Sequence, residues 1–378
     1  MINIEEARNR ILAAVSPLGL EQVNIVEALG RVTGEDVYAG RVTPPKDIST
    51  MDGYALRAED TCGASAESPV RLAVIEEIPA GAIPRKRIEP GEAARIMTGA
   101  PVPEGADAVT PLEDTDREGA RVAILVEVQA GGNIRRAGED VRHGATVISR
   151  GEIIRPAGVG MLASLGRSFI PVHQQPLVAI IATGNELAPI DAPPSEWKIV
   201  GSNSYSLATQ VRECGGIPLA IGIARDRRED LRAAFQAAMR ADLIVSSGGV
   251  SVGDYDLVKE IMQESGNAIH FWQVAMKPGR PLAFGELGGI PTVGLPGNPG
   301  SSAVAFELFI RPAILKMLGH ENLFRRCVRA RLDEAIVKKS GITHFIQARV
   351  RQEGEGYAVI AAGRHGSGIM TSMVRANG

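Results

Sequence analysis

Small residues and carboxylates stand together in the segment 246–256, which reads SSGGVSVGDYD. The apolar run ADLIV before it predicts a buried strand, and LVKEIMQES after it predicts a helix. A simple turn needs one or two glycines, whereas this loop has three glycines and three serines. Small residues let backbone N–H groups approach a ligand closely, and such groups attract anions. The segment therefore predicts an anion-binding loop with two carboxylates, Asp254 and Asp256, beside it.

Three further loops follow apolar runs that predict strands: TGNEL at 183–187, RD at 225–226 and PGNPGSS at 296–302. Apolar strands alternate with amphipathic helices from residue 177 onward, which predicts a doubly wound α/β domain with a parallel sheet. In such domains ligands bind beyond the carboxyl ends of the strands. One loop of this kind is more commonly an ordinary turn, but four at one edge of a sheet favour a binding site.

The charged residues in and near these loops suit a phosphate compound. GNPGSS opens a helix, so its N–H groups and the positive end of the helix dipole suit a phosphate. KPGRP at 277–281 adds two cations around a rigid turn. The carboxylates Glu186, Asp226, Asp254 and Asp256 are expected at the same edge, where they suit Mg²⁺ bound beside substrate phosphates. Taken singly, each acid would more commonly be a surface residue or a helix cap.

The elements that position these loops belong to a chain of several modules. Apolar residues at helical spacing in IEEARNRILAAV predict a helix at 4–15. Alternating runs between Gly- and Pro-rich turns predict a β-rich module from about residue 45 to 140. This module contains Asp52 in STMDGYAL, Thr98 in RIMTGAPVPEGADAV and Asp140 in RRAGED. On their own these three segments indicate only turns and charged loops.

Composition disfavours several classes of function. The net charge of −3 gives no basic footprint for nucleic acid, and 4% aromatic residues give no stacking platform for single strands. The three cysteines are far apart, which predicts a reducing compartment without a disulfide framework. No apolar run reaches the length of a membrane span, and the N-terminus is acidic where a signal peptide would be basic. We therefore expect a cytoplasmic protein that binds neither nucleic acid nor membrane.

Seven segments, in this order, resemble the molybdopterin molybdotransferase family (MoeA), whose eukaryotic relatives include the E domain of gephyrin: MDGYA, RIMTGAPVPEGADAV, NIRRAGED, TGNEL, SSGGVSVGDYD, KPGRP and LPGNP. They span residues 45 to 300, approximately, and so many ordered motifs are highly specific. The resemblance implies a multidomain α/β plus β fold. Its implied parts are an N-terminal helix packing on the α/β domain at 1–20, a segmented connecting domain at 21–44 and 141–175, an inserted β-rich domain at 45–140, a central doubly wound α/β molybdopterin-binding domain at 176–324, and a small C-terminal β-barrel at 325–378.

The activity that the resemblance implies is Mg²⁺-dependent cleavage of adenylylated molybdopterin with insertion of molybdate and release of AMP. It also implies a homodimer whose cleft lies between the α/β domain of one subunit and the inserted domain of the other. Molybdopterin adenylyltransferase and molybdoenzyme maturation factors are further possible partners. The alternative is a non-catalytic molybdopterin carrier or scaffold of the same fold. The dense set of acids favours the enzyme, whereas the loss of two cations of the family pattern favours the alternative.

Site residues follow from the resemblance position by position. The implied catalytic residues are Asp52, Thr98, Asp140, Glu186, Asp226, Asp256 and Lys277, of which Glu186, Asp226 and Asp256 would hold the metal. The implied cofactor-binding residues are Thr183, Gly184, Ser202, Asn203, Ser247, Gly248, Gly249, Val250, Ser251, Gly253, Pro278, Gly279, Arg280, Pro296, Gly297, Asn298 and Ser367.

The chain departs from the family pattern at two cations and at its end. The family often has a Lys where this chain has Gln273 and an Arg where it has Gln347. The chain also stops at MVRANG, where family members usually continue for another strand pair, so the barrel is short. Glutamine donates hydrogen bonds but brings no charge to a dianion such as molybdate. We therefore expect normal binding of the pterin nucleotide and weak binding of molybdate, with Arg280 and Arg349 compensating in part.

Overall fold

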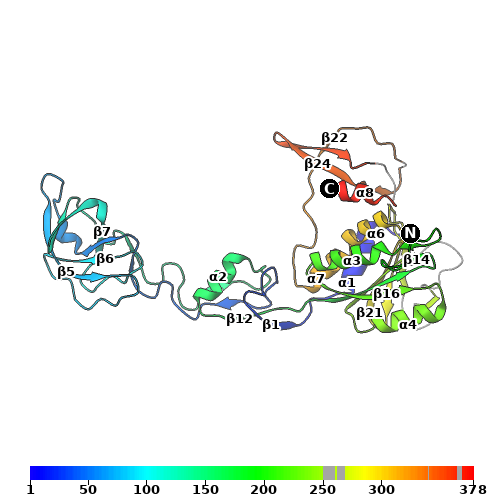
Figure 1. Ribbon diagram of the computed structural model, residues 1–378, viewed down its shortest axis with the longest axis horizontal. Helices are drawn as coiled ribbons and strands as arrows, with labels where there is room; N and C mark the ends of the chain where they lie inside the picture. Colours follow the sequence, from blue (N-terminus) through cyan, green and yellow to red (C-terminus); the bar gives the residue numbers. More distant parts are fainter. Residues whose placement is uncertain (250–259, 262–268, 339, 364–367) are drawn as a thin grey trace. The chain divides into compact units, whose positions relative to one another are not determined.

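The computed structural model (Figure 1) describes residues 1–249, 260–261, 269–338, 340–363 and 368–378. Six residues singled out above lie outside this part of the chain: Val250, Ser251, Gly253, Asp254, Asp256 and Ser367. The chain divides into two compact units. Unit 1 comprises residues 1–35, 150–155 and 169–378, and unit 2 comprises residues 36–149 and 156–168.

Unit 1 is built around a six-stranded sheet with the strand order β16-β13-β17-β21-β20-β18. Four neighbouring strands run parallel: β16 (Ile217–Ala224), β13 (Leu177–Thr183), β17 (Leu243–Ser247) and β21 (Ile290–Leu295). These strands coincide with the apolar runs of the sequence, because a strand covered on both faces buries every side chain. The predicted central α/β domain is confirmed.

An antiparallel edge, which the sequence pattern did not specify, extends the predicted parallel sheet. β20 (Pro281–Leu287) runs antiparallel to β21, and β18 (Ile269–Gln273) runs antiparallel to β20. Only Gly288 and Gly289 join β20 to β21, and their φ angles are 57° and 83°. Both glycines thus take the left-handed conformation of a two-residue hairpin turn. So short a connection must reverse the chain, whereas a parallel crossover needs a dozen residues or more.

Helices cover both faces of this sheet (Figure 1). Val178 and Ile180 of β13 join one hydrophobic core, and Ala179 and Ile181 join another, because successive side chains of a strand point to opposite faces. The first core also receives side chains from α1, α3, α6 and α7, and the second receives side chains from α4. The bounds of these helices are α1 (Ile4–Ala13), α3 (Ser202–Glu213), α4 (Arg228–Ala238), α6 (Pro299–Ala305) and α7 (Arg311–Met317), with a π-helical turn at Phe306–Ile310 between the last two.

Smaller sheets complete unit 1. β1 (Leu20–Asn24) pairs with β12 (Phe169–His173), and β14 (Leu187–Ala188) pairs with β15 (Ile199–Val200). The C-terminal segment forms a three-stranded sheet of β22 (Arg331–Leu332), β25 (Gly356–Ala361) and β24 (Ala348–Glu353), followed by α8 (Met370–Arg375). One pairing joins this segment to the α/β domain: β23 (Thr343–His344) runs parallel to β19 (Met276–Lys277).

Unit 2 contains the predicted β-rich module. Its main sheet has six strands in the order β7 (Ala108–Pro111), β4 (Gly53–Leu56), β6 (Glu92–Ile96), β5 (Val70–Ile78), β9 (Arg121–Ile124) and β8 (Thr115–Glu118). Tyr54 and Leu56 join one hydrophobic cluster and Ala55 joins another, so side chains are buried on both faces of β4. Two short pairs, β10 (Ile134–Arg135) with β3 (Ile48–Ser49) and β11 (Thr146–Ile148) with β2 (Val37–Tyr38), and the helix α2 (Pro156–Ser164) complete the unit.

Across the described residues of both units, every helix is too short or too polar to traverse a lipid bilayer.

Candidate functional site

Three of the four predicted loops leave adjacent strands of unit 1. Ser247, the last residue of β17, lies opposite Ala182 of β13 and opposite Leu295 of β21. Thr183, the last residue of β13, lies opposite Ala224 at the end of β16, so the fourth loop begins at the same edge. The described part of each loop therefore confirms the prediction that the four loops begin at the carboxyl edge of one sheet.

Glycines permit the close packing of these loops. The N–H of Gly248 donates to the carbonyl of Leu295 over 3.0 Å, and its φ angle of 94° favours glycine. A Cβ added at Gly248 would lie 2.4 Å from the carbonyl oxygen of Thr183. The same contact would meet any side chain, so the backbones after β13 and β17 approach each other only because position 248 is glycine. Gly297 lies against this point, since a Cβ added there would be 3.7 Å from the Cα of Gly248.

A buried amide spans two of these loops. Asn203, near the start of α3, donates from Nδ2 to Ser247 Oγ over 2.8 Å and to the carbonyl of Gly297 over 2.7 Å. Of the residues that the sequence assigned to the cofactor, Asn203, Ser247 and Thr183 are all buried, so their polar groups serve mainly to join loops. Ser202 is partly buried beside Asn203.

The acidic part of the edge is held by backbone hydrogen bonds. The N–H of Asn185 donates to Asp226 Oδ2 over 3.1 Å, and the N–H of Asp226 donates to Asn185 Oδ1 over 3.2 Å. This reciprocal pair ties the loop after β13 to the loop after β16. Lys198 Nζ donates to the carbonyl of Asn185. Asp226 and Glu186 are both exposed, so their carboxylates are accessible to a ligand.

Glu186 folds back over a glycine in the same loop. A Cβ added at Gly184 would lie 2.5 Å from Glu186 Oε1, so the carboxylate occupies space that only glycine leaves open. Exposed carboxylates are the kind of oxygen donor that Mg²⁺ prefers. Within the described residues there is no group of three or more His, Cys, Asp or Glu side chains placed to hold a metal ion. The third predicted metal ligand, Asp256, lies outside those residues, so the three-acid set stays a prediction.

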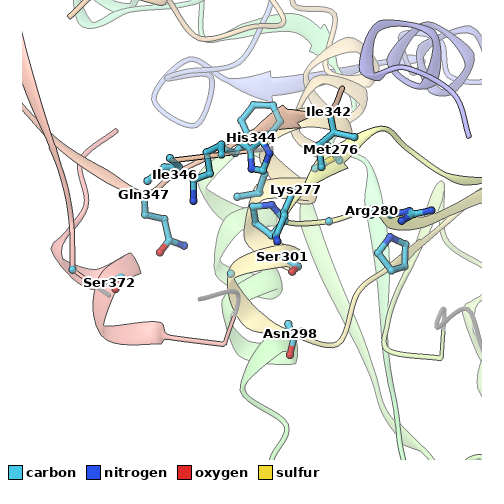
Figure 2. Close-up of a pocket in the computed structure, with 18 residues that line it drawn as sticks. Met276, Lys277, Arg280, Asn298, Ser301, Ile342, His344, Ile346, Gln347 and Ser372 are labelled. Atoms are coloured by element: carbon cyan, nitrogen blue, oxygen red, sulfur yellow. The ribbon is translucent and has the colours of Figure 1, made fainter. Parts of the chain in front are cut away.

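A cavity of about 620 Å³ lies between the KPGRP turn, the start of α6 and the C-terminal segment (Figure 2). Its lining includes five residues that the sequence assigned to the site: Lys277, Pro278, Gly279, Arg280 and Asn298. Figure 2 shows Lys277, Ser301 and Asn298 on one side and Gln347 and Ser372 on another. Pro296 and Gly297 do not line this cavity, although they immediately precede Asn298.

The two glutamines that replace family cations relate to this cavity in different ways. Gln347 lines it directly. Gln273 is not among the lining residues, but its Oε1 accepts a hydrogen bond of 3.4 Å from the guanidinium of Arg280, which does line it. Gln273 therefore contacts a residue of the cavity lining.

Sequence reasoning missed several lining residues from the C-terminal segment. Lys338, His344 and Ser372 line the cavity together with Ser301 from α6. The cations of KKSGITH, at 338–344, were the available signal, but nothing local connects that segment with residue 277. The connection is the pairing of Lys277 with His344 in the two-residue strands β19 and β23.

The two predicted acids of unit 2, Asp52 and Asp140, have different partners. Asp52 Oδ1 accepts hydrogen bonds of 2.7 Å from both the N–H and the hydroxyl of Thr98, so these two predicted residues lie together. The backbone N–H of Thr98, and then its hydroxyl, lower the pKa of the exposed Asp52 below its ordinary value. Asp140 instead forms an exposed ion pair with Arg135 over 3.5 Å.

Comparisons with known proteins agree with one another along the whole chain. Residues 2–166 match the family model described as MoeA N-terminal region (domain I and II), residues 179–316 match the probable molybdopterin binding domain, and residues 329–378 match the MoeA C-terminal region (domain IV).

Named relatives and a solved structure align with nearly the whole chain. Molybdopterin molybdenumtransferase 2 of Mycobacterium tuberculosis is 41% identical over 94% of this chain and 89% of its own length. Molybdopterin molybdenumtransferase of Bacillus subtilis is 36% identical over 100% of this chain and 89% of its own length. A crystal structure of the molybdopterin biosynthesis moeA protein of Pyrococcus horikoshii is 34% identical, with a TM-score of 0.85 over 100% of this chain and 94% of that one.

Proposed function

The chain belongs to the molybdopterin molybdenumtransferase (MoeA) family, and on that premise we propose how its residues divide the reaction. It is a transferase of molybdenum cofactor biosynthesis. The proposed substrates are adenylylated molybdopterin and molybdate, and the proposed products are molybdenum cofactor and AMP. The observation that carries this proposal is the placement of an accessible acidic edge and a cavity with cationic lining in one α/β unit.

The acidic edge is proposed to hold the phosphoanhydride that is cleaved. Glu186 and Asp226 would hold Mg²⁺ there together with Asp256, and they fit it because exposed oxygen donors lie on neighbouring loops. Bound Mg²⁺ would neutralise phosphate charge. The reciprocal bonds between Asn185 and Asp226 keep the two loops together, so the carboxylates need little rearrangement when the substrate binds.

The cavity is proposed to hold the oxyanion that is inserted. Lys277 and Arg280 supply positive charge, and Gln347, Ser301 and Ser372 supply hydrogen-bonding groups. Lys338 is a third cation of the lining, and Arg280 is engaged with Gln273. The expectation of weak molybdate binding rests on the neutral Gln347, which lines the cavity where the family pattern has an arginine.

Asp52, Thr98 and Asp140 of unit 2 are proposed to act in the same reaction. The support is their place in segments that resemble the family and the contact between Asp52 and Thr98. Because the pKa of Asp52 is lowered, its carboxylate is ionised at neutral pH. An ionised carboxylate suits an acceptor or metal ligand and does not suit a general acid.

We further propose a cytoplasmic homodimer that receives its substrate from a molybdopterin adenylyltransferase and passes its product to molybdoenzyme maturation factors. The support for the dimer is the implied site residues, which occur on both compact units. Light scattering at micromolar concentration should give the mass of two chains. A monomer under those conditions would contradict the shared site.

The direct test of the function is AMP release. Purified protein with adenylylated molybdopterin, Mg²⁺ and molybdate should release AMP and form molybdenum cofactor, and omission of the metal ion should stop both. Tight binding of molybdopterin without AMP release would instead identify a carrier or scaffold. Titration with tungstate in place of molybdate would determine which oxyanion is preferred.

A further inference from the structure

Asn203 breaks an apolar pattern on the buried face of α3. Asn203, Leu207 and Val211 follow one another at four-residue spacing, so they lie along one face of the helix. All three are buried, with exposed fractions of 8%, 1% and 0%. An apolar residue at position 203 would continue the stripe, and burying an amide is unfavourable unless it is hydrogen-bonded. The amide therefore has a function that packing alone does not explain.

The orientation of the amide follows from its partners. A carbonyl oxygen only accepts hydrogen bonds, so the group 2.7 Å from the carbonyl of Gly297 must be Nδ2. The second hydrogen of Nδ2 is directed to Ser247 Oγ at 2.8 Å. Both donors are thus committed, one to the end of β17 and one to the loop after β21. Oδ1 is buried and accepts no hydrogen bond from the described residues.

These two bonds determine the direction of a third group. In a trans peptide the C=O of one residue and the N–H of the next point in opposite directions. Because the Gly297 carbonyl is held toward Asn203, the N–H of Asn298 is directed away from it. Asn298 is exposed and lines the cavity described above. The amide of Asn203 therefore sets the plane of a peptide at the edge of the cavity.

The same amide also acts on the loop after β17. Ser247 directly precedes Gly248, whose Cα lies against Gly297 and whose position allows no Cβ. A small rotation at Ser247 would consequently bring Gly248 into contact with Thr183 or Gly297. Protein interiors are close-packed, so there is little free space around Gly248. The bond from Asn203 to Ser247 therefore helps to keep Gly248 in this position.

We propose that Asn203 is a positioning residue, which holds Ser247–Gly249 and the Gly297–Asn298 peptide in the arrangement that binds the phosphate part of the nucleotide, beside the cavity proposed for the oxyanion. It acts through Ser247 and the Gly297–Asn298 peptide and does not itself touch the substrate. The sequence resemblance placed Asn203 in contact with the cofactor, and the structure instead commits both of its donors to the protein. This inference rests on the proposed function, because it takes adenylylated molybdopterin as the nucleotide.

The test compares three substitutions of Asn203. Asn203→Leu keeps the approximate size and removes both donors, Asn203→Ala removes size and donors, and Asn203→Ser keeps one hydroxyl donor. The control is Thr209→Ala on the same helix, whose hydroxyl, among the residues that the structure describes, bonds to Tyr205 and Ser206 within α3. The measurements are the affinity for AMP by calorimetry, KM and kcat for AMP release, and the melting temperature.

We expect Asn203→Leu and Asn203→Ala to raise the Kd for AMP and the KM for the nucleotide by about 10- to 100-fold. Asn203→Ser should give intermediate values, and Thr209→Ala should match the wild type. A purely structural role would lower the melting temperature and the active fraction, and so the apparent kcat, but would leave KM and the Kd of the folded protein unchanged.

Wild-type KM and Kd in Asn203→Leu would overturn the proposal, and if that variant does not fold, wild-type values in Asn203→Ser would do so. A wild-type protein that neither binds AMP nor releases it would instead contradict the proposed function, so the two failures are distinguishable.

Discussion

The acidic edge and the cationic cavity of unit 1 are assembled in different ways. At the edge, Asn185 and Asp226 follow adjacent parallel strands and bond to each other's backbone. The cavity has one wall from the loops of the α/β domain and another from the C-terminal segment, joined by the short pairing of Lys277 with His344. The edge follows from strand order alone, whereas the cavity depends on a contact between distant segments. We therefore expect changes at the edge to affect catalysis and changes in the cavity to affect oxyanion affinity.

The largest effect is expected for Asp226→Asn at the acidic edge. The asparagine oxygen can still accept the N–H of Asn185, so the loop contact is retained while one negative charge is lost. The maximal rate of AMP release should fall by about 100-fold, because a bound divalent ion contributes several kcal/mol to such reactions. The control is Asp191→Asn, an exposed acid in the loop between β14 and β15. Full turnover in Asp226→Asn would show that this carboxylate has no part in the reaction.

The next effect is expected for Lys277→Ala in the cavity. A hydrogen bond to a charged group contributes about 1.5–3 kcal/mol, so molybdate affinity should fall by about 10- to 100-fold. The molybdate concentration that gives half-maximal insertion should rise accordingly. Lys46→Ala removes an exposed lysine of unit 2 and serves as the control. An unchanged half-saturating concentration would remove Lys277 from the oxyanion site.

A smaller effect of opposite sign is expected for Gln273→Lys. The substitution adds a positive charge and removes the oxygen that accepts from Arg280, so the guanidinium is released toward the cavity. The half-saturating concentration of molybdate should fall by about tenfold, with nucleotide affinity nearly unchanged. Gln236→Lys on the exposed face of α4 makes the same change in charge elsewhere. If wild type already saturates at low micromolar molybdate and Gln273→Lys changes nothing, Arg280 already supplies the charge.

The smallest effect concerns stability in unit 2. Since the pKa of Asp52 is lower in the folded protein than in the unfolded chain, its bonds with Thr98 stabilise the fold above the ordinary pKa of 3.8. This contribution is lost as pH falls through the lowered pKa. Thr98→Ala keeps the backbone bond and removes the hydroxyl bond, so it should lower the melting temperature slightly at pH 7, and the difference from wild type should shrink toward pH 3. Thr115→Ala, whose hydroxyl bonds to the uncharged carbonyl of Leu112, should show no such pH dependence.

The sequence predicted the strands of the α/β domain and the loops at their ends, because apolar runs and glycine-rich turns are local signals. It did not predict the antiparallel edge, which depends on the two-residue turn at Gly288 and Gly289. The second wall of the cavity was missed because β19 and β23 have two residues each and lie far apart in the chain. The ion pair of Asp140 with Arg135 was also not predicted, since a motif names residues without their contacts.

The division between edge and cavity is tested most directly by one molybdate titration of AMP release, performed on wild type, Asp226→Asn and Lys277→Ala. We expect Asp226→Asn to lower the maximal rate with little change in the half-saturating molybdate concentration. Lys277→Ala should raise that concentration and still approach the wild-type maximal rate. If both substitutions changed the same parameter, or if wild type released no AMP at any molybdate concentration, the proposed division between edge and cavity would be contradicted.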